Sequence, residues 1–302
     1  MKNMQIRLMA PADYPAISQI DLAAFKRDSI RSVENVGILN SFEPEGCFVA
    51  LYDHHIVGFI FTRILGKIGY FGPVAVLPEE QTKGLGKLLI ASALGYLKPR
   101  CNLVGIEVRP ESGRNIGLYY RMGFSTFLPT LVFELPKKVT FNLDHNSAVE
   151  ISDFSSAEKE NVLNEIASWT KKIEPDLDFT KDLKLVIAQK GFLAISKDDQ
   201  GSINGFLAYA PNLMTYIWGA VKEDQNQINN LRSLIYLANS KIQAKPLYLA
   251  INTRYNKVVE ELVAMNCRFL RAYNRMFWQK DNTKSDLTFV NDKNAVFRAL
   301  MG

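Results

Sequence analysis

A glycine-containing loop between an apolar run and an amphipathic one is the segment of this sequence best suited to chemistry. The loop comprises Gln81, Thr82, Lys83, Gly84, Leu85, Gly86 and Lys87. Glycines let the backbone adopt positive φ and turn its N–H groups inward, and a helix that begins there adds partial positive charge. Lys83 and Lys87 strengthen that field. The loop is therefore predicted to bind an anion, with phosphate as the natural candidate.

Two widespread phosphate-binding motifs share glycines with this loop but do not match it. The dinucleotide-binding pattern Gly-x-Gly-x-x-Gly follows a strand directly, whereas here six polar or turn residues, 78–83, intervene and no third glycine follows. The P-loop ends in Gly-Lys-Ser or Gly-Lys-Thr, and neither tripeptide closes this loop. The loop therefore matches neither of these two phosphate-binding motifs.

The loop resembles the pyrophosphate-binding motif of the Gcn5-related N-acetyltransferase (GNAT) superfamily, Gln/Arg-x-x-Gly-x-Gly/Ala. Gln81, Gly84 and Gly86 stand at its defined positions, after an apolar strand pattern and before an apolar helix pattern. A second signature of that superfamily is matched by Asn115, Leu118, Tyr119, Gly123 and Phe124. The resemblance covers most of the first half of the chain, to about residue 135.

The resemblance implies an acetyl-CoA cosubstrate and suggests which residues hold it. In such proteins the fourth and fifth strands splay apart and admit the pantetheine arm, whose amides pair with the fourth-strand backbone. Asn115 would then hydrogen-bond near that arm, and Tyr119 would face the thioester sulfur. The arm would pair with Val74, Ala75 and Val76, and the pyrophosphate would lie on the loop from Gln81 to Lys87.

The implied reaction is transfer of an acyl group, usually acetyl, to a primary amine of a small molecule or peptide. The amine must lose a proton, and the departing thiolate needs a donor. Tyr119 suits the donor role, with plain packing as the alternative. No carboxylate or histidine lies between Ile68 and Val76, so Glu107 is the nearest candidate base. Glu107 equally suits an ion pair with Arg109 or an exposed position.

Other functions stay open beside this one. A non-catalytic acyl-CoA-binding sensor or interaction protein would keep the loop and need no base. A longer acyl chain or a hydroxyl acceptor would also fit the same motifs. The sequence carries no motif that selects the acceptor.

An internal repeat organises the chain. The segment that begins at Gly46 resembles the one at Gly191, and Val76 corresponds to Val221, so that both pairs are 145 residues apart. A constant offset makes chance similarity less likely, and it predicts two copies of one plan. The first copy is predicted to have strands at 5–9, 47–52, 56–64, 68–76, 103–108, near 124 and at 130–135, with helices within 11–25 and at 29–39, 84–97 and 116–122.

The predicted fold class is α/β, with two tandem GNAT-like folds, each a mixed and mostly antiparallel sheet flanked by helices. A joint is expected within 136–148, where proline, lysines and polar residues interrupt the apolar pattern. The predicted domains are residues 1–138 with the intact loop and residues 139–280 with a degenerate second copy. Residues 281–302 form a tail, in which Leu287, Phe289, Val290, Val296, Phe297 and Leu300 are expected to pack as a strand and a helix.

The second copy lacks the residues that match the superfamily motifs in the first copy. Where the first copy has its glycine loop, the second has residues 221–230, which add Glu223 and Asp224 and contain no glycine. Such a loop disfavours an anionic pyrophosphate. Leu262 replaces Tyr119. The tandem arrangement also resembles mycothiol synthase, in which the second domain performs the transfer, so that specific activity is disfavoured here.

Composition sets the remaining expectations. The chain has 302 residues, 47% hydrophobic and 22% charged, with a formal net charge of +5, which is typical of a folded protein that binds neither nucleic acid nor membrane. Cys47, Cys101 and Cys267 lack disulfide or metal-site spacing, and no metal is expected. Residues 53–55, Asp-His-His, fit a solvated turn. A cytoplasmic location is expected, and the sequence allows a homodimer.

Overall fold

The structure is a computed structural model that describes residues 4–137, 148–172, 177–211, 216–243, 246–280 and 295–297. Contacts divide the described chain into two compact units. Unit 1 contains residues 4–106 with 278–280, and unit 2 contains residues 107–277 with 295–297. Within the described ranges, no helix has the length and apolar character needed to cross a membrane.

Unit 1 is built on a mixed sheet in which consecutive strands lie side by side. Strands β1 to β4 run antiparallel to their neighbours, and β5 is parallel to β4. The strands are β1 (Met4–Leu8), β2 (Phe48–Tyr52), β3 (His55–Leu65), β4 (Ile68–Val76) and β5 (Leu103–Val108), whose last two residues belong to unit 2.

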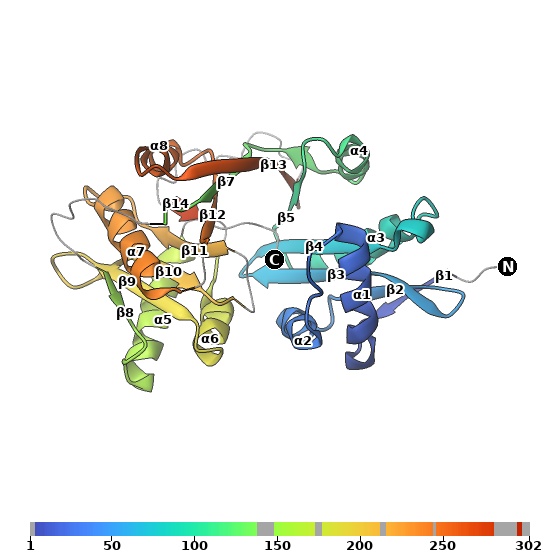
Figure 1. Ribbon diagram of the computed structural model, residues 1–302, viewed down its shortest axis with the longest axis horizontal. Coiled ribbons are helices and arrows are strands. Elements are labelled where there is room, and N and C mark those ends of the chain that lie inside the picture. Colours follow the sequence, from blue (N-terminus) through green and yellow to red (C-terminus); the bar gives the residue numbers. More distant parts are fainter. Residues whose placement is uncertain are drawn as a thin grey trace. The chain divides into compact units, whose positions relative to one another are not determined.

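Helices cover both faces of this sheet (Figure 1). A short 3₁₀ turn (Pro11–Asp13) leads into α1 (Tyr14–Phe25), which packs with α2 (Val33–Phe42) against β3. Their apolar side chains meet Phe59 and Phe61 in one core cluster. Helix α3 (Leu85–Leu97) lies on the opposite face, where Leu89 approaches Gly58. The alternation of side chains along β3 thus places one layer of helices on each face.

Unit 2 contains a second mixed sheet with strand order β13-β7-β12-β11-β10-β9-β8. Its strands are β6 (Ser125–Thr126), β7 (Thr130–Glu134), β8 (Ala148–Glu150), β9 (Phe192–Lys197), β10 (Ile203–Tyr209), β11 (Tyr216–Val221), β12 (Tyr248–Asn252), β13 (Arg268–Gln279) and β14 (Ala295–Phe297). Its helices are α4 (Gly113–Arg121), α5 (Ser156–Thr170), α6 (Thr180–Ala188), α7 (Gln227–Lys241) and α8 (Asn256–Ala264).

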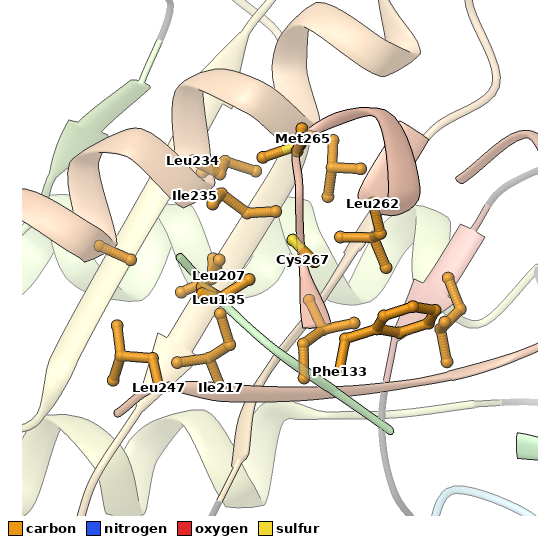
Figure 2. Close-up of a cluster of buried hydrophobic side chains, with 14 of the residues drawn as sticks. Phe133, Leu135, Leu207, Ile217, Leu234, Ile235, Leu247, Leu262, Met265 and Cys267 are labelled. Atoms are coloured by element: carbon orange, nitrogen blue, oxygen red, sulfur yellow. The ribbon is translucent and has the colours of Figure 1, made fainter. Parts of the chain in front are cut away.

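The cores of unit 2 lie on the two faces of this sheet. On one face, Phe206 and Trp218 contact Trp169 of α5 and Phe179 before α6. On the other face, an apolar cluster joins strands β10 to β12 with α7 and α8. Figure 2 shows Phe133 from β7 inside that second cluster, next to residues that come from the second copy of the repeat.

The observed elements confirm the predicted fold class and the plan of the first copy. Strand β4 spans the predicted residues, and α3 begins one residue later than predicted. One difference concerns β7, which pairs with β12 and β13 in unit 2, so contacts group the chain at residues 106/107 rather than near residue 138. The predicted joint overlaps 138–147, outside the described residues, and the predicted domain ranges stay a prediction.

Two glycines of unit 1 give a matched test of this packing. Gly58→Ala is expected to lower the free energy of unfolding by about 1–3 kcal/mol, because the added Cβ would lie 2.7 Å from Ala75 O. Gly95→Ala on α3 is expected to raise it by about 0.4–1 kcal/mol, since the new methyl group meets nothing within 4 Å. Urea unfolding of both variants measures this difference, and equal midpoints would contradict the described packing at Gly58.

Candidate functional site

The end of β4 has one backbone edge paired and the other open within unit 1. On its first edge, β4 pairs with β3 as far as the pair Gly58↔Val76. On its second edge, the parallel pairing with β5 covers only Ile68, Gly69 and Tyr70. At residues 74–76, the described part of unit 1 therefore gives the second edge of β4 no strand partner. The expected splay between the fourth and fifth strands is present.

A bulge at the point of divergence turns the outer part of β4. The register with β3 shifts between Ile60 and Thr62, opposite Gly72 and Pro73 of β4. Such irregularities bend a strand and redirect its backbone groups. Val74, Ala75 and Val76, the residues expected to pair with a pantetheine arm, follow this bulge directly. An extended ligand with amide groups could add to this edge as a strand does.

The glycine loop follows the open edge and is anchored to it. The Gln81 side chain donates a hydrogen bond from Nε2 to Val76 O at 3.1 Å. Thr82 and Gly84 have φ values of 74° and 88°, in the left-handed region that turns consecutive amides toward one side. The residues from Gln81 to Gly84 are exposed. The geometry of the loop thus comes from two positive-φ residues and one side-chain anchor.

The start of α3 offers unsatisfied backbone N–H groups. Gly84 is the N-cap, and no side chain caps this helix, whereas Ser32 caps α2 through the amide of Asn35. The first N–H groups of any helix lack partners within it. A Cβ at Gly84 would meet nothing within 4 Å, and one at Gly86 only Val76 Cγ2 at 4.0 Å. The helix start therefore has room for an anionic group against the backbone.

The two lysines of the loop differ in their surroundings. Lys83 Nζ lies 2.6 Å from Glu80 Oε2 and 4.3 Å from the centre of the Tyr52 ring. The hydrogen bond to Glu80 raises the pKa of Lys83, and the carboxylate offsets part of its charge. Lys87 is exposed on the first turn of α3. The sequence pattern predicted both as cations of the loop, but it did not indicate the Glu80 partner of Lys83.

Asn115 and Tyr119 lie on α4 in unit 2, one helical turn apart. Asn115 is exposed, whereas Tyr119 is 4% exposed and its ring meets that of Phe124 edge to face. Burial raises the pKa of the Tyr119 hydroxyl. The hydroxyl accordingly stays protonated at neutral and moderately alkaline pH, which is the state that a hydrogen-bond donor needs. The ring contact with Phe124 is what the packing alternative expects, and the role of Tyr119 stays a prediction.

Glu107 is buried in an ion pair that sequence reasoning did not predict. Its Oε1 accepts hydrogen bonds from Arg275 Nη2 at 2.8 Å and Arg275 Nε at 3.2 Å. The carboxylate is buried rather than exposed. Arg275 lies 168 residues away in the sequence, so no local pattern indicates it. The proposed role of Glu107 as base stays a prediction.

The other residues considered from the sequence lie in an exposed turn or in the buried core. Asp53 and His54 have positive φ in the exposed turn between β2 and β3, as the hairpin pattern predicted. The three cysteines are free and buried, and burial raises the pKa of the Cys101 thiol to about 11. Among the described residues, no group of three His, Cys, Asp or Glu is placed to hold a metal ion.

Comparisons with known proteins agree with this geometry. The sequence profile of the Acetyltransferase (GNAT) family matches residues 14–124. An uncharacterized N-acetyltransferase of Methanocaldococcus jannaschii is 30% identical over 125 residues, which cover 40% of this chain and 78% of that protein. A mycothiol acetyltransferase of Streptomyces griseus is 35% identical over 95 residues, 30% of this chain and only 31% of that protein. The chain belongs to the GNAT acetyltransferase family.

Solved structures resemble the chain over most of its length. A Pyrococcus horikoshii protein assigned as an acetyltransferase has a TM-score of 0.70 at 17% identity, and the match covers 92% of this chain and 90% of that one. A GCN5-related N-acetyltransferase from Sphaerobacter thermophilus has a TM-score of 0.62 at 14% identity, covering 92% and 96%. At these identities the likeness is one of fold, and it extends across both copies of the repeat.

The Glu107–Arg275 pair can be tested as a structural element. Glu107→Gln is expected to lower the free energy of unfolding by about 3–5 kcal/mol, because the Arg275 charge is left buried without its counter-charge. The double variant Glu107→Gln/Arg275→Gln is expected to lose less than the single variant. Urea unfolding measures both. A single variant as stable as the parent, with kcat reduced more than about tenfold, would instead identify Glu107 as the base.

Proposed function

We propose that the protein is an acetyl-CoA-dependent N-acetyltransferase whose first copy binds the cosubstrate. The open edge of β4, which ends in a glycine loop and an uncapped helix, carries this proposal. Strand residues Val74 to Val76 would hold the pantetheine amides, and the loop from Gln81 to Lys87 would hold the pyrophosphate. Asn115 would hydrogen-bond near the pantetheine arm. Family membership supports acetyl transfer, and positive φ at Thr82 and Gly84 before the exposed start of α3 supports an anion there.

The bound thioester would supply the activated acetyl group. The nitrogen of a neutral primary amine forms a bond to the thioester carbonyl carbon, the carbon–sulfur bond breaks, and the electron pair leaves on sulfur. The amine loses one proton, and the thiolate gains one. Tyr119 is suited to donate to the departing sulfur, because its buried hydroxyl keeps its proton over the ordinary pH range. Donation of this kind lowers the barrier by stabilising charge that develops during the reaction.

We infer that the second copy does not carry out this transfer. Its counterpart loop leads into α7 without a glycine, and Leu262 occupies the position of Tyr119. The match covers 31% to 46% of the length of the curated mycothiol acetyltransferases, so their substrate is not carried over to this chain. A small molecule or peptide with a primary amine remains the proposed class of acceptor.

One observation favours a second candidate, an acyl-CoA-binding protein without catalysis. The only carboxylate proposed as base, Glu107, is already engaged by Arg275. A binding protein would keep the β4 edge and the loop and would need neither Glu107 nor Tyr119 for chemistry. The two candidates share the cosubstrate site and differ in turnover.

Titration calorimetry tests the cosubstrate site. Gly86→Glu is expected to weaken acetyl-CoA binding at least about tenfold, because it places bulk and negative charge at the helix start. It should leave the fold intact, since the new Cβ meets only Val76 at 4.0 Å. Gly95→Glu makes the same change farther along α3, where a Cβ meets nothing within 4 Å, and should bind like the parent. Failure of the parent to bind would overturn the proposed function.

Two adjacent tyrosines separate catalysis from binding. Tyr119→Phe is expected to lower kcat about 100-fold, with KM changed less than about threefold, if the hydroxyl donates to the leaving sulfur. Tyr120→Phe is the control, because its exposed hydroxyl bonds only to Thr126 in the described contacts. Steady-state kinetics with an amine found by screening gives both values. Unchanged kcat in Tyr119→Phe would leave Tyr119 with a packing role alone.

A further inference from the structure

The second copy diverges between its fourth and fifth strands in the same way as the first. Strand β11 corresponds to β4 and β12 to β5 by their order and direction in the sheets. The parallel pairing of β11 with β12 covers only Tyr216 and Ile217 on β11. Beyond Ile217, β12 no longer pairs with β11 in the described register. The second copy thus has the same opening that the first copy offers to a ligand.

A strand from the far end of the chain fills this opening. Ala295, Val296 and Phe297 of β14 pair antiparallel with Val221, Ala220 and Gly219 of β11. Strand β14 also contacts β12. At the repeat offset of 145 residues, the β11 segment 219–221 corresponds to Val74–Val76 of β4. The backbone edge that is open in the first copy is therefore occupied in the second.

Side-chain packing holds β14 in this place. Val296 is partly buried against the apolar cluster that includes Ile217, Val221 and Leu249. The contact joins the tail to the core between β11 and β12 rather than to an exposed surface. Because a strand that adds to an edge gains both backbone hydrogen bonds and side-chain burial, the segment is held as a sheet member.

The helix start of the second copy is also filled from within the chain. Asp224 Oδ1 accepts a hydrogen bond from the amide of Asn226, the N-cap of α7, at 2.7 Å. The other oxygen, Oδ2, accepts from Asn204 Nδ2 at 3.2 Å. A carboxylate thus lies two residues before the N-cap of α7, whereas Thr82 stands two residues before Gly84, the N-cap of α3. Its charge repels a second anion there.

We propose that the C-terminal strand β14 is an internal ligand of the second copy, which takes the place there that an extended ligand takes on β4. Strand β14 pairs with the β11 edge, and the Asp224 carboxylate adds negative charge beside the start of α7. The second copy is consequently a strand-binding site whose occupant is the chain's own tail, and it admits no second acyl-CoA. This inference rests on the pairing and packing of β14, so it holds whether or not the first copy turns over a substrate.

Hydrogen exchange on the full-length protein tests the proposal without any added ligand. Val296→Asp is expected to speed amide exchange in the peptide that contains residues 216–221 at least about tenfold, because the charged side chain cannot pack against the apolar cluster. Val296→Ile is the control and should exchange like the parent. Exchange in unit 1 around β4 should be the same in all three proteins. Equal exchange at 216–221 in the parent and in a folded Val296→Asp variant would overturn the proposal.

A cross-link provides a second measurement if Val296→Asp does not fold. Ala220 and Val296 are directly opposite in the antiparallel register, a separation that a disulfide can span. The full-length Ala220→Cys/Val296→Cys variant is expected to form this bond on mild oxidation, as peptide mapping shows, while Ala220→Cys alone should not. Absence of the bond in the folded double variant would contradict the docked strand. Acetyl-CoA titration of the cross-linked protein should give one equivalent, and two equivalents would show that the second copy is open.

Discussion

An incomplete strand pairing underlies the binding features of this protein. The parallel pairing of β4 with β5 stops at Tyr70, and that of β11 with β12 stops at Ile217. Backbone N–H and C=O groups beyond these points need other partners, because unpaired groups away from water are costly. Each copy therefore has an opening in its sheet next to the start of a helix. The same incomplete parallel pairing occurs in both copies, but different groups lie at the unpaired strand edge in each.

The first copy keeps its opening accessible to a ligand, and the second fills it from the chain. In the first copy, positive φ at Thr82 and Gly84 leads into a helix with no side-chain cap. In the second copy, Asp224 accepts from the N-cap amide of α7, and β14 pairs with β11. The same arrangement of strands thus ends in an exposed glycine loop in one copy and in a paired strand edge in the other.

The candidate catalytic groups show how burial changes the meaning of a sequence pattern. The motif around Tyr119 indicated a hydroxyl donor, and burial is consistent with that role because it raises the pKa of the hydroxyl. Glu107 was the candidate base because it is a carboxylate on the predicted fifth strand. In the structure its carboxylate is buried within unit 2 and accepts a hydrogen bond from Arg275. Residue type and spacing select candidates, whereas the partner of a buried charge decides what it does.

The sequence by itself determined the local elements and the glycine loop of this protein. Alternation and helical periodicity predicted β4 and α3 almost to the residue, and the glycines at 84 and 86 predicted the open helix start, because these features depend on neighbouring residues alone. The tertiary structure decided which distant segments meet. It paired β7 with β12, Glu107 with Arg275 and β14 with β11. Such pairings depend on the packing of the whole chain, and no local pattern records them.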